Sequence, residues 1–118
     1  MENLSKQELH NLAMNIVGEQ LESEGYEFLG INSQFKKDPQ FVALKHGKLH
    51  FVIVRAIEYP NDPREFDSFA LQKIKEHAAK FNAKTFYAGV GLANKTDYEI
   101  PLNKDSDFIV NYEGMQEI

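Results

Sequence analysis

Residues 49–60, LHFVIVRAIEYP, read as a β-strand that is apolar on both faces until Arg55 interrupts it. A strand without polar alternation is typical of a sheet that is covered on both sides. A guanidinium stays charged near neutral pH, so its place in the middle of such a strand needs an explanation. If Arg55 lies inside, an ion pair with a carboxylate such as Glu19, Glu22 or Glu58 would offset the cost of its burial. Alternatively, Arg55 reaches the edge of the sheet or faces a ligand.

The rest of the chain predicts two helices and four further strands. Ser5 and Glu8 form an S-x-x-E capping box at the start of an apolar helical stripe. Asp62 as N-cap with Pro63 at the first helical position marks the start of the second helix. The pair at 46–47, His-Gly, suits a tight hairpin turn. The expected order is a helix over 4–24, strands over 26–33, 40–45 and 48–59, a helix from residue 62, and strands over 84–92 and 107–112.

This order predicts the fold class. A hairpin followed by a crossover helix and another strand gives a mixed sheet, and both long strands are too apolar to leave a face in water. We therefore expect one α/β domain over residues 1–118, with a three-layer mixed β-sheet flanked by helices. Gly89 and Gly91 lie on one strand face, where they would let a helix approach closely; they lack the third glycine of a dinucleotide fingerprint.

The composition narrows the classes of function. The 118 residues are 42% hydrophobic and carry a net charge of −5, which would repel nucleic acid outside a local basic patch. There is no cysteine, and the closely spaced pair His46 and His50 brackets a hairpin instead of sharing a helix face, so thiolate and zinc sites are not expected, and we expect no cofactor. The N-terminal residues lack a secretory signal pattern and no apolar run approaches about 18 residues, so we expect a cytoplasmic protein without a membrane segment.

Several local patterns resemble the restriction-endonuclease-like fold of the PD-(D/E)XK superfamily. They are Gly25-Tyr26 at the opening of the first strand, the hairpin, LHFVIVR where such a nuclease typically reads LVFVEVK, and ALQKIKEHAAKF followed by AKTFYAGV. The chain is similar to small bacterial proteins related to the archaeal Holliday-junction resolvases, over roughly residues 9–92. The resemblance implies a scaffold that binds Mg²⁺ through carboxylates of its second and third strands, with a lysine beside the attacking water.

The residues at the matching positions depart from that chemistry. The second-strand aspartate falls on Gln40, the third-strand acid on Ile53 and the lysine on Arg55. An isoleucine cannot bind a metal, and an arginine cannot release a proton near neutral pH. We therefore expect a catalytically inactive member of the superfamily, a pseudoenzyme that serves as a binding or assembly module. Related proteins often pair, so a homodimer is also expected.

Two other readings stay open at this point. A divergent Mg²⁺-dependent nuclease acting on DNA would recruit Glu19, Asp38 or Glu58 in place of the missing ligands. Separately, four lysines near the hairpin could form a basic patch for phosphates, with Phe35 and Phe41 stacking on bases. Alternatively, these lysines simply belong to charged turns that are exposed to solvent. These lysines are Lys36, Lys37, Lys45 and Lys48.

Overall fold

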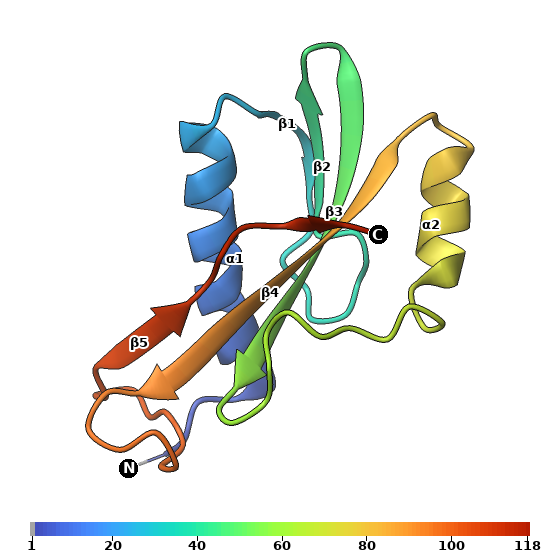
Figure 1. The fold of residues 1–118 in the computed structure, drawn as a ribbon. Coiled ribbons are helices and arrows are strands. Elements are labelled where there is room, and N and C mark those ends of the chain that lie inside the picture. Colours follow the sequence, from blue (N-terminus) through green and yellow to red (C-terminus); the bar gives the residue numbers. More distant parts are fainter. Residues whose placement is uncertain (1) are drawn as a thin grey trace.

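The computed structural model describes residues 2–118 and shows an α/β fold with a mixed sheet of six strands and two helices (Figure 1). The strand order is β1-β2-β3-β4-β5, with β6 paired to β4. Strands β3 and β4 are parallel and every other pair is antiparallel. The elements are α1 (Lys6–Ser23), β1 (Glu27–Ile31), β2 (Phe41–Lys45), β3 (Lys48–Glu58), α2 (Gln72–Ala79), β4 (Lys84–Asn94), β5 (Phe108–Asn111) and β6 (Gln116–Glu117).

The first helix begins where the capping box predicts. The Glu8 N–H donates to Ser5 Oγ at 3.1 Å, and the Ser5 N–H donates to Glu8 Oε1 at 2.9 Å. Two backbone donors at the helix start are thereby satisfied. The apolar stripe of α1 then packs on one face of the sheet and makes the larger core, through Leu9, Ala13, Met14, Val17 and Leu21.

Strand β3 is covered on both sides, as its sequence predicts. Val52 and Val54 belong to the core beneath α1, whereas Ile53 packs with Leu71 and Tyr87 in a second cluster on the opposite face. Alternate residues of a strand point to opposite faces, so the two clusters lie on either side of the sheet. Figure 1 shows α1 and α2 on these two sides, with the sheet between them.

The hairpin between β2 and β3 also follows the prediction. His46 and Gly47 have φ values of 52° and 75°, and Lys45 pairs with Lys48 across the turn. Positive φ at both central residues matches the twist of the flanking strands, so the turn fixes the register of the hairpin.

The second helix does not start at Asp62, which corrects the sequence prediction. Residues 62–71 form turns, and α2 begins only at Gln72. Asp62 Oδ1 accepts from the Arg64 N–H at 2.9 Å, so its carboxylate closes a short turn instead of capping a helix. Aspartate before proline favours both outcomes, and tertiary packing decides between them.

The contact between Pro63 and β4 favours the turn over the helix at this position. A Cβ on Gly89 would lie 1.9 Å from the Pro63 carbonyl oxygen, and one on Gly91 would lie 3.2 Å from Pro63 Cγ. The two glycines therefore admit the segment that connects β3 to α2, rather than the helix expected from the sequence. Through this contact, the segment that begins at residue 62 lies against the sheet near the C-terminal end of β3.

The sequence reading missed the C-terminal strand. Strand β6 has two residues, which pair with Phe86 and Tyr87 of β4, and a strand this short carries no readable alternation. The last predicted strand is confirmed as β5, which pairs with the end of β4. Neither helix among residues 2–118 combines the length and the apolar composition needed to cross a bilayer.

Candidate functional site

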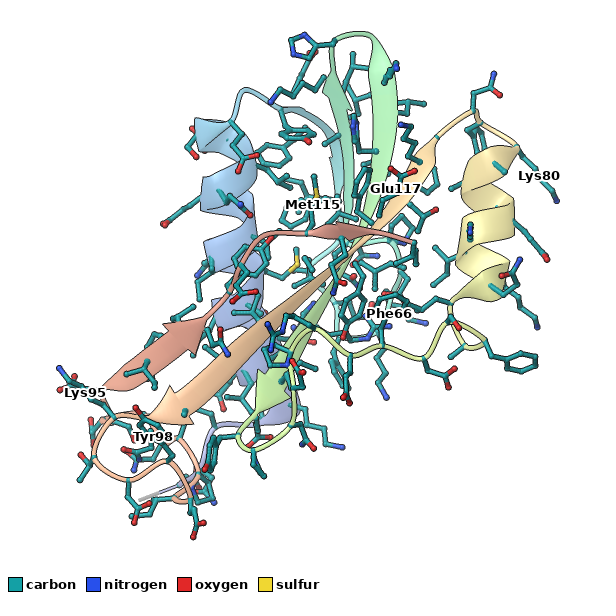
Figure 2. The ribbon with its side chains drawn as sticks, viewed as in Figure 1. Phe66, Lys80, Lys95, Tyr98, Met115 and Glu117 are labelled. Atoms are coloured by element: carbon teal, nitrogen blue, oxygen red, sulfur yellow. The ribbon has the colours of Figure 1, made fainter. Side chains whose placement is uncertain are left out.

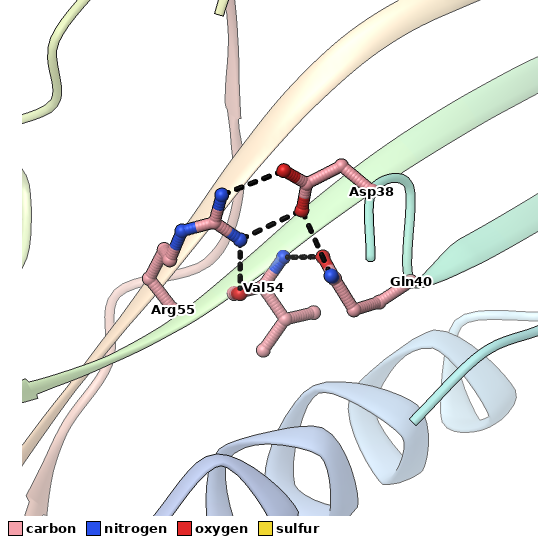
Figure 3. Close-up of polar contacts among 4 residues, drawn as sticks. All are labelled: Asp38, Gln40, Val54 and Arg55. Carbon is pink, nitrogen blue, oxygen red and sulfur yellow. Dashed lines mark hydrogen bonds and ion pairs between the residues drawn. The ribbon is translucent and has the colours of Figure 1, made fainter. Parts of the chain in front are cut away.

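Arg55 forms a two-pronged ion pair with Asp38 (Figure 3). Nη1 and Nη2 of the guanidinium each donate to one carboxylate oxygen, both at 2.7 Å, and Nη1 also donates to the Val54 carbonyl at 3.0 Å. The side chains are 18% and 12% exposed. An arginine fork that matches both oxygens of a carboxylate is the strongest geometry for such a pair. The cation in the core strand is therefore held by a structural ion pair.

This partner corrects the sequence expectation, which named Glu19, Glu22 or Glu58. Asp38 lies in the connection between β1 and β2, seventeen residues before Arg55. Asp38 stands two residues before Gln40, and that neighbourhood is the only sequence signal that could have indicated it.

Gln40 joins the pair to the edge of β3. Its side chain is fully buried; Oε1 accepts from the Val54 N–H at 2.7 Å, and Nε2 donates to Asp38 Oδ1 at 2.8 Å. Strand β2 begins at Phe41, so the amide of Gln40 satisfies a backbone group of β3 just past the end of the ladder. We call Asp38, Gln40 and Arg55 the DQR network.

The network lowers the pKa of Asp38. Burial alone would raise the pKa of the carboxyl, but the hydrogen bonds from Arg55 and Gln40, together with the charge of Arg55, outweigh that effect. Asp38 is therefore ionised at neutral pH and cannot act as a general acid there.

His10 of α1 lies near the network and is fully buried. Neither ring nitrogen has a hydrogen-bond partner among residues 2–118, and the imidazole and the Phe35 ring form a T-shaped pair with centroids 5.8 Å apart. Burial and then the charge of Arg55 lower its pKa, against a smaller opposing effect of Asp38. The imidazole is therefore neutral at pH 7. Sequence analysis missed this residue because it occupies an apolar position of the helical stripe.

The DQR network borders a cavity of about 610 Å³ beside the last residues of β3. Its walls come from the start of α1, the connection before β2, and the segment between β3 and α2, whose Phe66 is labelled in Figure 2. In α/β sheets, ligands bind outside the carboxyl ends of parallel strands, and this cavity lies at such an end of β3. The cavity is lined by Lys6, Leu9, Phe35, Lys36, Asp38, Arg55, Ala56, Ile57, Glu58, Glu65, Phe66, Asp67, Ala70, Leu71 and Tyr87.

The three positions matched to the nuclease motif take different places. Gln40 and Arg55 converge through Asp38, whereas Ile53 is fully buried in the cluster with Leu71 and Tyr87. Both of these neighbours line the cavity, so Ile53 lies directly behind its wall. The side chain at position 53 offers only hydrocarbon there.

The acids proposed for a divergent metal site do not gather. Asp38 and Glu58 line the cavity, whereas Glu19 borders a separate depression between α1 and β1. Within residues 2–118, no three histidine or acidic side chains lie together in an arrangement that could hold a metal ion. Mg²⁺ needs several oxygen ligands in octahedral geometry, and Asp38, the acid that contacts Gln40 and Arg55, is already paired with the guanidinium on both oxygens. The donor set does not fit the metal of the nuclease chemistry.

The four lysines lie in two pairs at the two ends of β2, and the basic patch expected from the sequence stays a prediction. Lys36 and Lys37 lie before β2, and Lys45 and Lys48 flank the hairpin turn after it. The length of β2, roughly 15 Å, separates the two pairs. The two aromatic residues are also unsuited to stacking. Phe41 is 3% exposed in the core, and Phe35 lies between His10 and the Nζ of Lys36.

Comparison with known protein families gives a match over residues 7–118, to a domain of unknown function (DUF8840). Comparisons with curated proteins and with solved structures find no match.

Proposed function

We propose that this chain, which belongs to the DUF8840 family, is a non-catalytic binding module on a restriction-endonuclease-like scaffold. The cavity beside the DQR network is its binding site. The observation that carries the proposal is the use of Asp38: the acid that contacts both Gln40 and Arg55 is bound on its two oxygens by the guanidinium. A site arranged in this way can recognise a ligand but holds no divalent ion for hydrolysis.

The topology supports the choice of scaffold. A helix precedes an antiparallel β1-β2-β3 unit, and a crossover through α2 adds β4 parallel to β3. The cavity also lies where the resemblance puts the reaction centre, beside Gln40 and Arg55. The proposal thus treats the DQR network as the replacement of a metal site by an ion pair.

The proposal is tested by a cleavage assay. Purified protein is incubated with branched and with duplex DNA in Mg²⁺ or Mn²⁺, beside the Arg55→Ala variant. We expect no cleavage above the background of the variant. Metal-dependent cleavage by the wild type that Arg55→Ala abolishes would overturn the proposal and favour the divergent nuclease.

The expected homodimer remains a prediction of the same proposal, and nucleic acid remains an alternative ligand at a surface outside the cavity. Sedimentation of the full chain tests the first. A gel-shift titration across salt concentrations tests the second, because phosphate contacts weaken steeply as salt rises.

A further inference from the structure

The edge of β3 is uncovered where it borders the cavity. Strand β2 pairs with β3 only as far as Val52, and β3 continues to Glu58. The Tyr59 N–H donates to Leu92 of β4, so the backbone groups of odd-numbered residues face β4 and those of even-numbered residues face the opposite edge. Among residues 2–118, no strand lies beside that edge from Val54 to Glu58.

Several backbone N–H and carbonyl groups on this edge of β3 already have hydrogen-bond partners, and the others can be identified one by one. Gln40 accepts from the Val54 N–H, Arg55 donates to the Val54 carbonyl, and the Asn61 N–H donates to the Glu58 carbonyl at 3.0 Å. Within residues 2–118, no loop or side chain is hydrogen-bonded to the N–H or the carbonyl of Ala56. The Glu58 N–H likewise makes no hydrogen bond among residues 2–118. Three neighbouring backbone groups are thus presented in the pattern that an added strand would complete.

The walls of the cavity suit a single extended segment. The cavity is lined by Leu9 of α1 on one face of the sheet and by Phe66 and Leu71 on the other, so it encloses the β3 edge between them. A recess of about 610 Å³ that borders one strand edge suits a single extended peptide strand.

The charge of the cavity disfavours nucleic acid. Three cations line it, against four acids, so it lacks the array of positive charge that successive phosphates require, whereas a single carboxylate needs one guanidinium edge. A peptide offers neutral backbone groups to the edge and side chains to the apolar walls. The cations are Lys6, Lys36 and Arg55, and the acids are Asp38, Glu58, Glu65 and Asp67.

Arg55 adds a specific contact for such a peptide. Asp38 and Val54 take three of its five N–H donors, all on Nη1 and Nη2. The Nε donor and the second donor of Nη2 make no hydrogen bond among residues 2–118, and these two form the side edge of the guanidinium that receives a carboxylate in two-pronged fashion.

We propose that the cavity binds an extended peptide that adds a short strand to β3 at Ala56 and Glu58 and places a carboxylate on the free edge of Arg55. This inference rests on the proposed function and names its class of ligand. The carboxylate comes from the C-terminus of the peptide or from an acidic side chain.

The test uses the full chain and a synthetic library of random hexapeptides. Each sequence is present as a free acid and as a C-terminal amide. Two tryptophan variants accompany the wild type: Ala70→Trp fills the cavity from its exposed rim, and Ala79→Trp is a matched control on an exposed position of α2 outside it. We expect selected peptides to bind the wild type and Ala79→Trp alike, and to bind Ala70→Trp at least tenfold more weakly.

The position of the bound peptide is read from backbone amides by ¹⁵N NMR. We expect the amide signals of Ala56 and Glu58 to shift and their hydrogen exchange to slow when a selected peptide is added to the wild type. This readout does not depend on the folding of any variant. A preference for the free acid assigns the carboxylate to the C-terminus, whereas enrichment of Asp and Glu in both forms assigns it to a side chain.

Any of three results with peptides would overturn the inference. They are the selection of no peptide, equal binding to Ala70→Trp in a folded state, and amide shifts confined to residues outside the β3 edge. Dimerisation of the wild type that Ala70→Trp abolishes without added peptide would assign the cavity to a second copy, and would also overturn it. DNA cleavage tests the proposed function separately: its absence leaves the binding module standing even when no peptide binds.

Discussion

Replacing Asp38 by asparagine tests whether the DQR network stabilises the fold. The substitution keeps the size of the side chain and one oxygen, so Gln40 retains an acceptor. It removes the negative charge and one of the two oxygens that Arg55 contacts. Arg55 is then left 18% exposed without a counter-charge.

The magnitude follows from the contacts that are lost. Removing one partner of a fully buried ion pair costs about 3–5 kcal/mol. The cost here is smaller, because the remaining oxygen of asparagine still accepts one hydrogen bond and the cavity admits water to the free edge of Arg55. We expect the free energy of unfolding to fall by about 2 kcal/mol. At roughly 2.1 cal/mol/K per residue, this corresponds to a Tm lower by about 8 °C.

The assay is urea unfolding at pH 7 of the wild type, Asp38→Asn, Arg55→Gln and the double variant. Arg55→Gln leaves the Asp38 carboxylate without its cation, so we expect a loss of about 2 kcal/mol there too. In the double variant no charge is unpaired, and the total loss should fall short of the sum of the two single losses by about 1 kcal/mol or more. Single losses under about 0.5 kcal/mol, or strictly additive ones, would refute the reasoning.

Acidification tests the same ion pair, because the pKa of Asp38 is lowered in the folded protein. The stabilisation that the Asp38 carboxylate contributes is complete above about pH 4, the ordinary aspartate pKa, and is lost as pH falls through the lowered pKa. The free energy of unfolding of Asp38→Asn should therefore differ least from that of the wild type in strong acid. Because the pKa of His10 is lowered in the fold, the unfolded chain binds a proton at a higher pH than the folded chain, and the free energy of unfolding should decline as pH falls below about 6.5. In urea unfolding between pH 7 and 5, His10→Leu should flatten that decline without lowering the free energy of unfolding at pH 7. An unchanged slope would contradict the burial of a neutral imidazole. Gly89→Ala should lower the free energy of unfolding by about 1–3 kcal/mol and displace the Pro63 segment. The control Gly30→Ala, whose added Cβ would lie an ordinary 3.8 Å from Val42, should cost under about 1 kcal/mol. Equal losses in thermal unfolding would argue against the contact between Pro63 and β4.

Local patterns predicted most of the fold because each of its elements carries its own signal. The capping box set the start of α1, His46-Gly47 set the hairpin, and the apolar run of β3 required cover on both faces. The start of α2 could not be read in this way. Asp62-Pro63 suits a turn as well as a helix, and the choice depends on two glycines some 26 residues further along the chain.

The candidate site was predictable only in part, because its contacts are not local. Arg55 was singled out as a cation that needs a carboxylate, but several acids were equally available in the sequence. Asp38 is selected by the path of the connection before β2, which places it over β3. The role of Gln40 depends on β2 beginning one residue after it, and His10 was hidden in an apolar helical stripe.

Binding of Mn²⁺ to the full chain, measured by isothermal titration calorimetry at neutral pH, tests the central claim most directly. Because Asp38 is bound to Arg55 on both oxygens, no stoichiometric site with a Kd below about 1 mM is expected, and Asp38→Asn should give the same flat titration. A stoichiometric site of micromolar affinity that Asp38→Asn abolishes would contradict the claim that an ion pair stands in place of the metal.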